Sequence, residues 1–223
     1  FFRQWIGSDN FPAESGRYHL IISTACPWAH RCSIIRKLKS LEDIISMSEV
    51  EPLMLNHGWE FKKSSTDFSD LDYLYQLYLQ ANVEYQGRVT VPVLWDTYTK
   101  QIVNNESSEI IRMFNSEFDH ITGNSLNLYP ENLHSQINSL NDLIYDSINN
   151  GVYKAGFSTS QKEYEKACRR LFTSLENIDN HLDGKIWLCG DEFTEADIRL
   201  FPTLLRFDPV YVSHFKCSLK QIR

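Results

Sequence analysis

The sequence predicts two parts, an α/β N-terminal half and an all-helical C-terminal half. In the N-terminal half, short β-rich runs alternate with segments whose apolar residues recur at helical spacing. After Phe118 the composition changes to turn residues, with a Thr-Gly-Asn-Ser stretch and a Tyr-Pro pair. Beyond them only helical patterns follow. These three observations together predict the fold class.

The N-terminal elements are expected in the order β-α-β-α-β-β-α. Pro27 marks the start of the first helix, because proline suits the first helical position. Pro92 lies inside the third expected strand and makes it an edge strand or a specialised bend. The expected strands cover residues 18–23, 44–50, 89–96 and 101–103, and the expected helices begin at residues 27, 71 and 105–108.

The C-terminal half is expected to begin after a linker at residues 119–130. The sequence therefore predicts one domain at residues 1–118 and a helical domain at residues 131–223. Thr194 and Asp197 resemble a capping box at the start of the last helix, and the plain interpretation of this motif is structural. The helical patterns cover residues 131–149, 160–183 and 195–206.

Composition excludes several classes of protein. The chain has 223 residues, 42% of them hydrophobic, so it can bury a sizeable core. The formal net charge is −7, and lysine and arginine form no long run, so we expect no nucleic-acid partner. No apolar stretch approaches the ~20 residues of a membrane-spanning helix, and from the opening Phe1-Phe2-Arg3-Gln4-Trp5 we expect no signal peptide. We therefore expect no membrane partner.

The cysteines do not form a disulfide pattern. They are five in number and widely spread, which favours a reducing, cytoplasmic setting. His214 and Cys217 are the nearest approach to a metal-binding pair, and a single pair is weak, so we expect no metal. The cysteines are Cys26, Cys32, Cys168, Cys189 and Cys217.

Cys26 is the candidate nucleophile. It lies between a strand and the helix that begins at Pro27, where free backbone N–H groups and the helix dipole stabilise a thiolate. Residue 29 is alanine, so no Cys-x-x-Cys pair can resolve a mixed disulfide. Cys32 is six residues further on, about 240° around the helix, and cannot readily fold back. A mixed disulfide at Cys26 must therefore await an external thiol.

Two further elements suit a short peptide ligand. The Val91–Pro92 bond stands at a strand start, where it can be cis and offer the backbone of Val91 to an extended peptide. Glu106 and Ser107 stand at a helix start and offer an acceptor for an ammonium group and donors for a carboxylate. Together with Cys26, these elements predict a site for a short, thiol-bearing peptide.

At this point the sequence resembles a known family, the cysteine-type glutathione transferases. More narrowly, it resembles their xi class, the glutathionyl-hydroquinone reductases, whose N-terminal domain is thioredoxin-like and whose C-terminal domain is all-helical. Several of the matching blocks are peculiar to this class, and they span nearly the whole chain. The blocks are CPWAHR at 26–31, PLML at 52–55, GW at 58–59, GRVTVPVLWD at 87–96, NES at 105–107, NGVYKAGF at 150–157, EADIRL at 195–200 and RFDPVY at 206–211.

The resemblance implies roles for individual residues. Cys26 would be the nucleophile, and glutathione would be the co-substrate. Tyr153 would act as proton donor or acceptor for the leaving phenol, and Tyr211 would help to lower the pKa of the cysteine. A buried tyrosine usually just finds a hydrogen-bond partner, so a structural role stays open for both. The residues implied to bind glutathione are Trp59, Arg88, Val89, Thr90, Val91, Glu106 and Ser107.

The expected substrates are glutathionylated aromatic hydroquinones, and the resemblance implies a homodimer. Family members continue past the region of Phe215 into further helices, whereas this sequence stops at Arg223, so the helical domain is expected to be incomplete. Two alternatives stay open. One is an omega-like thiol transferase or dehydroascorbate reductase with the same fold. The other is a non-catalytic interaction protein with this fold.

Overall fold

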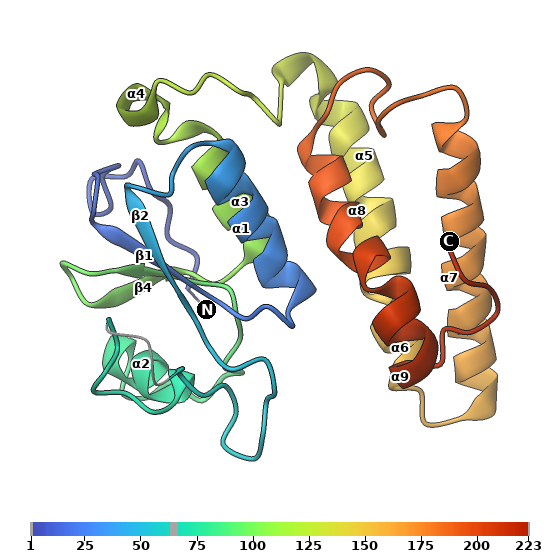
Figure 1. Ribbon diagram of the computed structural model, residues 1–223, viewed down its shortest axis with the longest axis horizontal. Helices are drawn as coiled ribbons and strands as arrows, with labels where there is room; N and C mark the ends of the chain where they lie inside the picture. The colour runs from blue at the N-terminus through green and yellow to red at the C-terminus, as the bar shows by residue number, and fades with distance from the viewer. Residues whose placement is uncertain (1, 63–66, 223) are drawn as a thin grey trace. The chain divides into compact units, whose positions relative to one another are not determined.

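The computed structural model describes residues 2–62 and 67–222 and consists of two compact units (Figure 1). The first unit is Phe1–Leu126 and the second is Asn127–Arg223. The boundary falls within the linker predicted at 119–130, although the first residues of that stretch form the short helix α4 (Asp119–Thr122).

A four-stranded mixed sheet forms the centre of the first unit. Its order is β2-β1-β3-β4, with β1 and β2 parallel and the other two pairs antiparallel. Tyr18 of β1 pairs with Ile45 on one side and Asp96 on the other. The strands are β1 (Tyr18–Ile22), β2 (Ile45–Glu49), β3 (Val93–Asp96) and β4 (Gln101–Asn104). All four predicted strands are therefore present.

The third strand is shorter than predicted. It was expected from residue 89, but β3 begins at Val93. Pro92 has no N–H for the ladder, so regular pairing starts only after it. The Val91–Pro92 peptide bond is cis, as the sequence suggested.

Helices cover both faces of this sheet. α1 and α3 pack side by side on one face, and α2 lies on the other side (Figure 1). α2 begins at Leu74 rather than at residue 71, because the Gln76 side chain caps the backbone N–H groups of Asp72 and Tyr73 at that point. The helices are α1 (Pro27–Leu38), α2 (Leu74–Ala81) and α3 (Ser107–Ser116).

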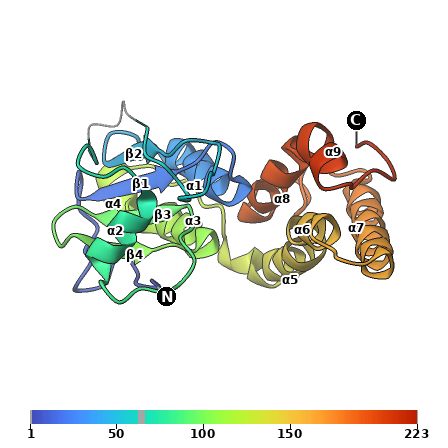
Figure 2. The same cartoon turned by 90° about the horizontal axis from the view of Figure 1, so that it is seen from below.

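In the part of the second unit that the structure describes, the regular elements are all helical and loops join them. α5 packs against α8, and α6 packs against α7 (Figures 1 and 2). The helix predicted at 131–149 is divided into a 3-10 turn, α5 and a π-helical turn, and the separate helix α6 was not predicted. The elements are η1 (Glu131–Leu133), α5 (His134–Ile144), η2 (Tyr145–Asn149), α6 (Gly151–Gly156), α7 (Gln161–Leu182), α8 (Glu195–Leu205), η3 (Phe207–Tyr211) and α9 (Val212–His214).

The capping box predicted before α8 is present. The Thr194 hydroxyl accepts a hydrogen bond from the Ala196 N–H at 3.3 Å, and the Asp197 carboxylate accepts one from the Thr194 N–H at 2.9 Å. The other carboxylate oxygen of Asp197 accepts from the Leu188 N–H at 2.9 Å, which ties the preceding loop to the helix start. The motif thus has the structural role that the sequence indicated.

His19 of β1 is a buried titratable group that the sequence did not single out. The residue is 1% exposed, and its Nδ1 lies 2.6 Å from the Ser46 hydroxyl. The Phe68 ring packs edge-on against it at 5.0 Å. Burial lowers the pKa of His19 to about 4, against a partial upward effect of the Asp67 carboxylate and a smaller downward effect of Arg36.

This burial predicts acid sensitivity. The unfolded chain protonates the histidine near pH 6.5, whereas the folded chain resists protonation down to about pH 4. Its contribution to stability is therefore complete above pH 6.5 and is lost as the pH falls toward 4, by up to about 3 kcal/mol. Urea unfolding measured between pH 7.5 and 4 tests this. His19→Gln should flatten the pH dependence, whereas His120→Gln, at an exposed position, should leave it unchanged.

Candidate active site

Cys26 caps the N-terminus of α1. Its backbone is extended, and its Sγ accepts a hydrogen bond from the Ala29 N–H at 3.5 Å. Pro27 occupies the first helical position, as predicted. The side chain thus stands at the free N–H groups of the first turn, the place where a helix stabilises a thiolate.

The neighbouring cysteine has the opposite environment. Cys32 is fully buried on α1, and burial raises the pKa of its thiol well above the usual value. Its Sγ lies 3.9 Å from the Ser107 carbonyl oxygen. Burial also raises the pKa of Cys189, and that of Cys217 to about 12. These three thiols are poor nucleophiles because they remain protonated near neutral pH.

The Cys26 thiol reaches the residue before the cis-proline. Its S–H donates to the Val91 carbonyl oxygen at 3.5 Å, and Val91 is only 5% exposed. The carbonyl that the sequence predicted to be open is therefore engaged by the thiol. A thiolate has no proton to donate, so ionisation of Cys26 frees this carbonyl for the N–H group of a bound peptide.

Tyr78 of α2 holds the segment that precedes Val91. Its hydroxyl donates to the Thr90 carbonyl oxygen at 2.8 Å and accepts from the Thr90 N–H at 3.3 Å. The Asn105 amide donates to the same hydroxyl at 3.2 Å. Burial raises the pKa of Tyr78, so the hydroxyl stays neutral. Tyr78 lies in the helix expected from residue 71, whose apolar pattern carries no sign of these polar contacts.

The start of α3 presents both a hydrogen-bond acceptor and a hydrogen-bond donor. Glu106 is the N-cap residue, and one of its carboxylate oxygens accepts from the Ser108 N–H at 3.1 Å. The other oxygen lies 3.6 Å from the Arg3 guanidinium. Ser107 is 2% exposed, and its hydroxyl has no hydrogen-bond partner among the described residues. A buried hydroxyl of this kind is rare, and it suits an added ligand. No pattern in the sequence indicated that Arg3 contacts Glu106.

The remaining residues predicted to bind glutathione are Trp59, Arg88 and Val89, and two of them make backbone hydrogen bonds that hold their segments. Trp59 is half-buried, and its carbonyl oxygen accepts from the Leu74 N–H at 2.9 Å, where the chain enters α2. Arg88 is exposed, and its carbonyl oxygen accepts from the Tyr85 hydroxyl at 2.7 Å. Val89 is half-buried between Arg88 and Thr90.

The two predicted tyrosines lie together in the second unit. Tyr153 of α6 is partly buried, and Tyr211 at the end of η3 is 2% exposed. Their ring centroids are 6.1 Å apart at 73°. Phe157 and Phe215 complete an aromatic cluster with them. The structure thus brings together two residues that are 58 positions apart in the sequence.

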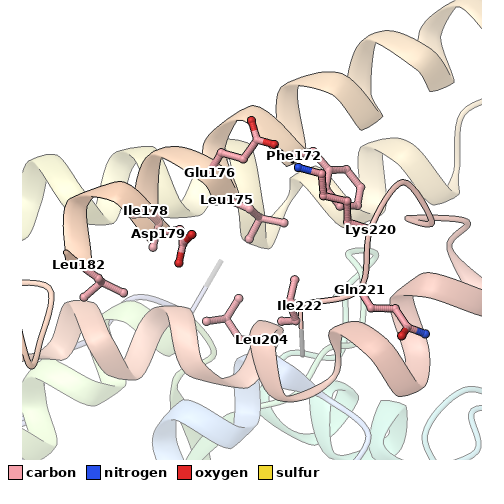
Figure 3. Close-up of a pocket in the computed structure, with 10 residues that line it drawn as sticks. All are labelled: Phe172, Leu175, Glu176, Ile178, Asp179, Leu182, Leu204, Lys220, Gln221 and Ile222. Atoms are coloured by element: carbon pink, nitrogen blue, oxygen red, sulfur yellow. Dashed lines mark hydrogen bonds and ion pairs between the residues drawn. The ribbon is translucent and has the colours of Figure 1, made fainter.

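A cavity of about 440 Å³ in the same unit lies elsewhere (Figure 3). It is formed by α7, α8 and the C-terminal segment, and neither Tyr153 nor Tyr211 lines it. Figure 3 shows Leu204 and Ile222 facing α7 across it. The Lys220 ammonium forms a 2.7 Å ion pair with Glu176 at its rim. This cavity is therefore separate from the aromatic cluster.

The described residues contain neither a candidate membrane-spanning helix nor a candidate metal centre. No helix among them is both long and apolar enough to cross a lipid bilayer. In residues 2–62 and 67–222, no three His, Cys, Asp or Glu side chains are grouped so that they could hold a metal ion.

Two family models match the chain. One is described as "Glutathione S-transferase, N-terminal domain" and matches residues 25–117. The other is "Glutathione S-transferase, C-terminal domain" and matches residues 161–221.

Two curated relatives carry the same functional name. The chain is 51% identical to the glutathionyl-hydroquinone reductase YqjG of Escherichia coli over 235 residues, covering 99% of this chain and 72% of YqjG. It is 50% identical to the glutathionyl-hydroquinone reductase PcpF of Sphingobium chlorophenolicum over 216 residues, covering 95% of this chain and 69% of PcpF.

Solved structures match the whole chain. The xi glutathione S-transferase of Phanerochaete chrysosporium has a TM-score of 0.96 and 51% identity, covering 100% of this chain and 78% of the other. The glutathione-bound structure of YqjG from Escherichia coli has the same TM-score and identity, covering 100% of this chain and 77% of the other.

Proposed function

This chain belongs to the xi class of the glutathione S-transferase family, and we propose that it is a glutathionyl-hydroquinone reductase. It removes glutathione from glutathionylated aromatic hydroquinones and uses a second glutathione to regenerate itself. The observation that carries the proposal is Cys26 at the first turn of α1 with alanine, not cysteine, at residue 29. This arrangement gives a nucleophilic thiol without an internal resolving partner.

The first step transfers glutathione to the protein. The Cys26 thiolate attacks the glutathione sulfur of the substrate, so a Cys26–glutathione disulfide forms while the bond between sulfur and the aromatic ring breaks. The ring carbon keeps the electron pair and takes up a proton, which gives the free hydroquinone. Tyr153 is proposed to exchange a proton with the phenol oxygen of the leaving ring, and Tyr211 to favour the thiolate.

The second step regenerates the thiolate. A glutathione thiolate attacks the glutathione sulfur of the mixed disulfide, glutathione disulfide departs, and Cys26 leaves as thiolate. The aromatic ring is reduced by two electrons, and two glutathione moieties are oxidised to one disulfide. Two-step exchange of this kind predicts ping-pong kinetics.

The proposed glutathione site uses the features around Cys26. The backbone of Val91 would pair with the cysteinyl part of glutathione, and the start of α3 would hold its γ-glutamyl end. There the Ser107 hydroxyl, which has no partner among the described residues, would donate a hydrogen bond to the carboxylate. The Glu106 carboxylate would bind the ammonium group, which would replace the Arg3 guanidinium as its partner. The complete proposed set is Trp59, Arg88, Val89, Thr90, Val91, Glu106 and Ser107.

Intact-mass analysis with glutathionyl-menadione, kept in its reduced hydroquinone form in this test and in those below, tests the function. The expected result is one glutathione on the protein, located on Cys26 by peptide mapping, together with an equal amount of free hydroquinone. Added glutathione should then remove the adduct. Absence of both the adduct and free hydroquinone, while glutathione disulfide still glutathionylates Cys26, would contradict the reductase function and favour a thiol transferase. Comparison with the rate on dehydroascorbate would distinguish the two.

We also propose that the protein acts in the cytoplasm as a homodimer. The five cysteines are all free thiols, which is consistent with a reducing compartment. The dimer follows only from the family resemblance. Sedimentation equilibrium at micromolar concentration checks it, and a single species with the mass of one chain would contradict it.

Tyr78→Phe is expected to weaken glutathione binding on the order of tenfold, because the Thr90 backbone and the Asn105 amide lose their shared partner. Calorimetric titration with glutathione measures the effect. The matched control is Tyr18→Phe, which removes another buried hydroxyl bond, to the Pro12 carbonyl oxygen at 2.7 Å. Equal affinity in the two variants would show that Tyr78 does not support the site.

A further inference from the structure

Phe215 is the ring that joins the aromatic cluster of the second unit. Its centroid lies 5.4 Å from that of Tyr153 and 5.2 Å from that of Tyr211, at 86° and 77°. Phe157 packs against it at 5.5 Å and 63°. These distances and steep angles are those of favourable edge-to-face pairs. Both tyrosines assigned to the reaction thus contact the same phenylalanine, which no step of the proposed mechanism uses.

Gly156 makes room for this ring. A Cβ at residue 156 would lie 2.3 Å from Cδ1 of Phe215 and 2.9 Å from its Cγ and Cβ. Gly156 is the last residue of α6 and does not have a left-handed backbone, so its conformation does not require glycine. Alanine is favoured over glycine in helices. The absent side chain therefore serves the close approach of Phe215 to the helix that carries Tyr153.

The segment around Phe215 is tied down on both sides. The Cys217 N–H donates to the Tyr211 carbonyl oxygen at 2.9 Å, which closes a turn around residue 215. The Tyr164 hydroxyl of α7 donates to the Lys216 carbonyl oxygen at 2.7 Å. The Cys217 thiol is fully buried and faces the Val152 carbonyl oxygen of α6 at 3.9 Å. Phe215 is thus held in a fixed place against α6.

We propose that Phe215, seated on Gly156, is a positioning residue that fixes the orientation of the Tyr153 ring for departure of the hydroquinone. The proposal rests on the proposed function, since it concerns the step in which Tyr153 meets the leaving phenol. Without the Phe215 ring, Tyr153 loses one wall of its packing and its hydroxyl is spread over several orientations. Transfer of glutathione between thiols has no phenol to release, so it does not depend on this orientation.

The test compares two substrates of the same Cys26 thiolate. One is glutathionyl-menadione, and the other is the mixed disulfide of glutathione and 2-mercaptoethanol, which has no aromatic leaving group. Phe215→Leu is expected to lower kcat on glutathionyl-menadione about fivefold to tenfold, with KM unchanged and the rate on the mixed disulfide within about twofold. Phe193→Leu is the matched control, because its half-buried ring packs on Trp187 at 4.6 Å and touches neither tyrosine.

Gly156→Ala is the second variant and keeps every ring of the cluster. Its new methyl group must displace Phe215. It should therefore lower the ratio of the rate on glutathionyl-menadione to the rate on the mixed disulfide, even though alanine favours the helix. Thermal unfolding of each variant confirms that it is folded. Unchanged ratios in both variants, with an active wild-type protein, would overturn the positioning role. A wild-type protein that releases no hydroquinone would overturn the proposed function and, with it, this proposal.

Discussion

Replacing Cys26 with serine is expected to lower the turnover of glutathionyl-menadione by about 1,000-fold or more, because the reaction loses its nucleophile. A serine hydroxyl at the start of α1 can accept the same Ala29 N–H, so the helix cap and the fold are retained. It is not ionised near neutral pH and cannot form a disulfide with glutathione. Steady-state release of menadiol and intact-mass analysis measure the two losses separately.

The matched control is Cys32→Ala on the same helix. Cys32 is fully buried with a raised pKa, so its removal should leave turnover within about twofold of wild type, at a modest cost in stability. If Cys26→Ser kept even a tenth of the wild-type rate, or if glutathione appeared on Cys32, the assignment of Cys26 would be wrong. Steady-state release of menadiol shows the first outcome, and peptide mapping after incubation with substrate shows the second.

The part of the site around Cys26 was predictable because its signals are local. A β-rich run, a cysteine, a proline and a helical pattern follow one another within about twenty residues, and the structure has β1, Cys26 and α1 in this order. The start of α3 was predictable for the same reason, since its capping residues precede the apolar pattern directly. The family resemblance added the tyrosines, which no local pattern had marked.

The positioning contacts were not predictable because they join distant parts of the chain. Tyr78 and Thr90 meet because α2 packs beside the segment before the cis-proline, and Arg3 reaches Glu106 because the N-terminal segment runs along β4. Neither pairing leaves a periodic pattern in the sequence.

The predicted helix boundaries in the second unit were wrong for a different reason. The π-helical turn Tyr145–Asn149 continues the apolar pattern of α5, so the two read as one helix.

Lys39 shows how a single long-range contact supports the first unit. It lies at the end of α1, and its side chain is 1% exposed. Its ammonium donates to the carbonyl oxygens of Asn124, at 2.9 Å, and Leu126, and pairs with the Asp119 carboxylate at 2.8 Å. The segment after α3 is thereby fastened to α1, at the point where the first unit ends. A buried lysine is tolerated only when its charge is satisfied in this way.

Lys39→Met is therefore expected to destabilise the protein by about 2 kcal/mol, because methionine keeps the apolar contacts but leaves two backbone carbonyls and the half-exposed Asp119 carboxylate without their cation. For a chain of this length, that loss corresponds to a fall in Tm of roughly 4–8 °C. Differential scanning calorimetry measures it. Lys37→Met, an exposed lysine in the last turn of the same helix, is the matched control and should change stability by no more than about 0.5 kcal/mol. Equal melting temperatures for the two variants would show that the Lys39 charge does not hold this segment.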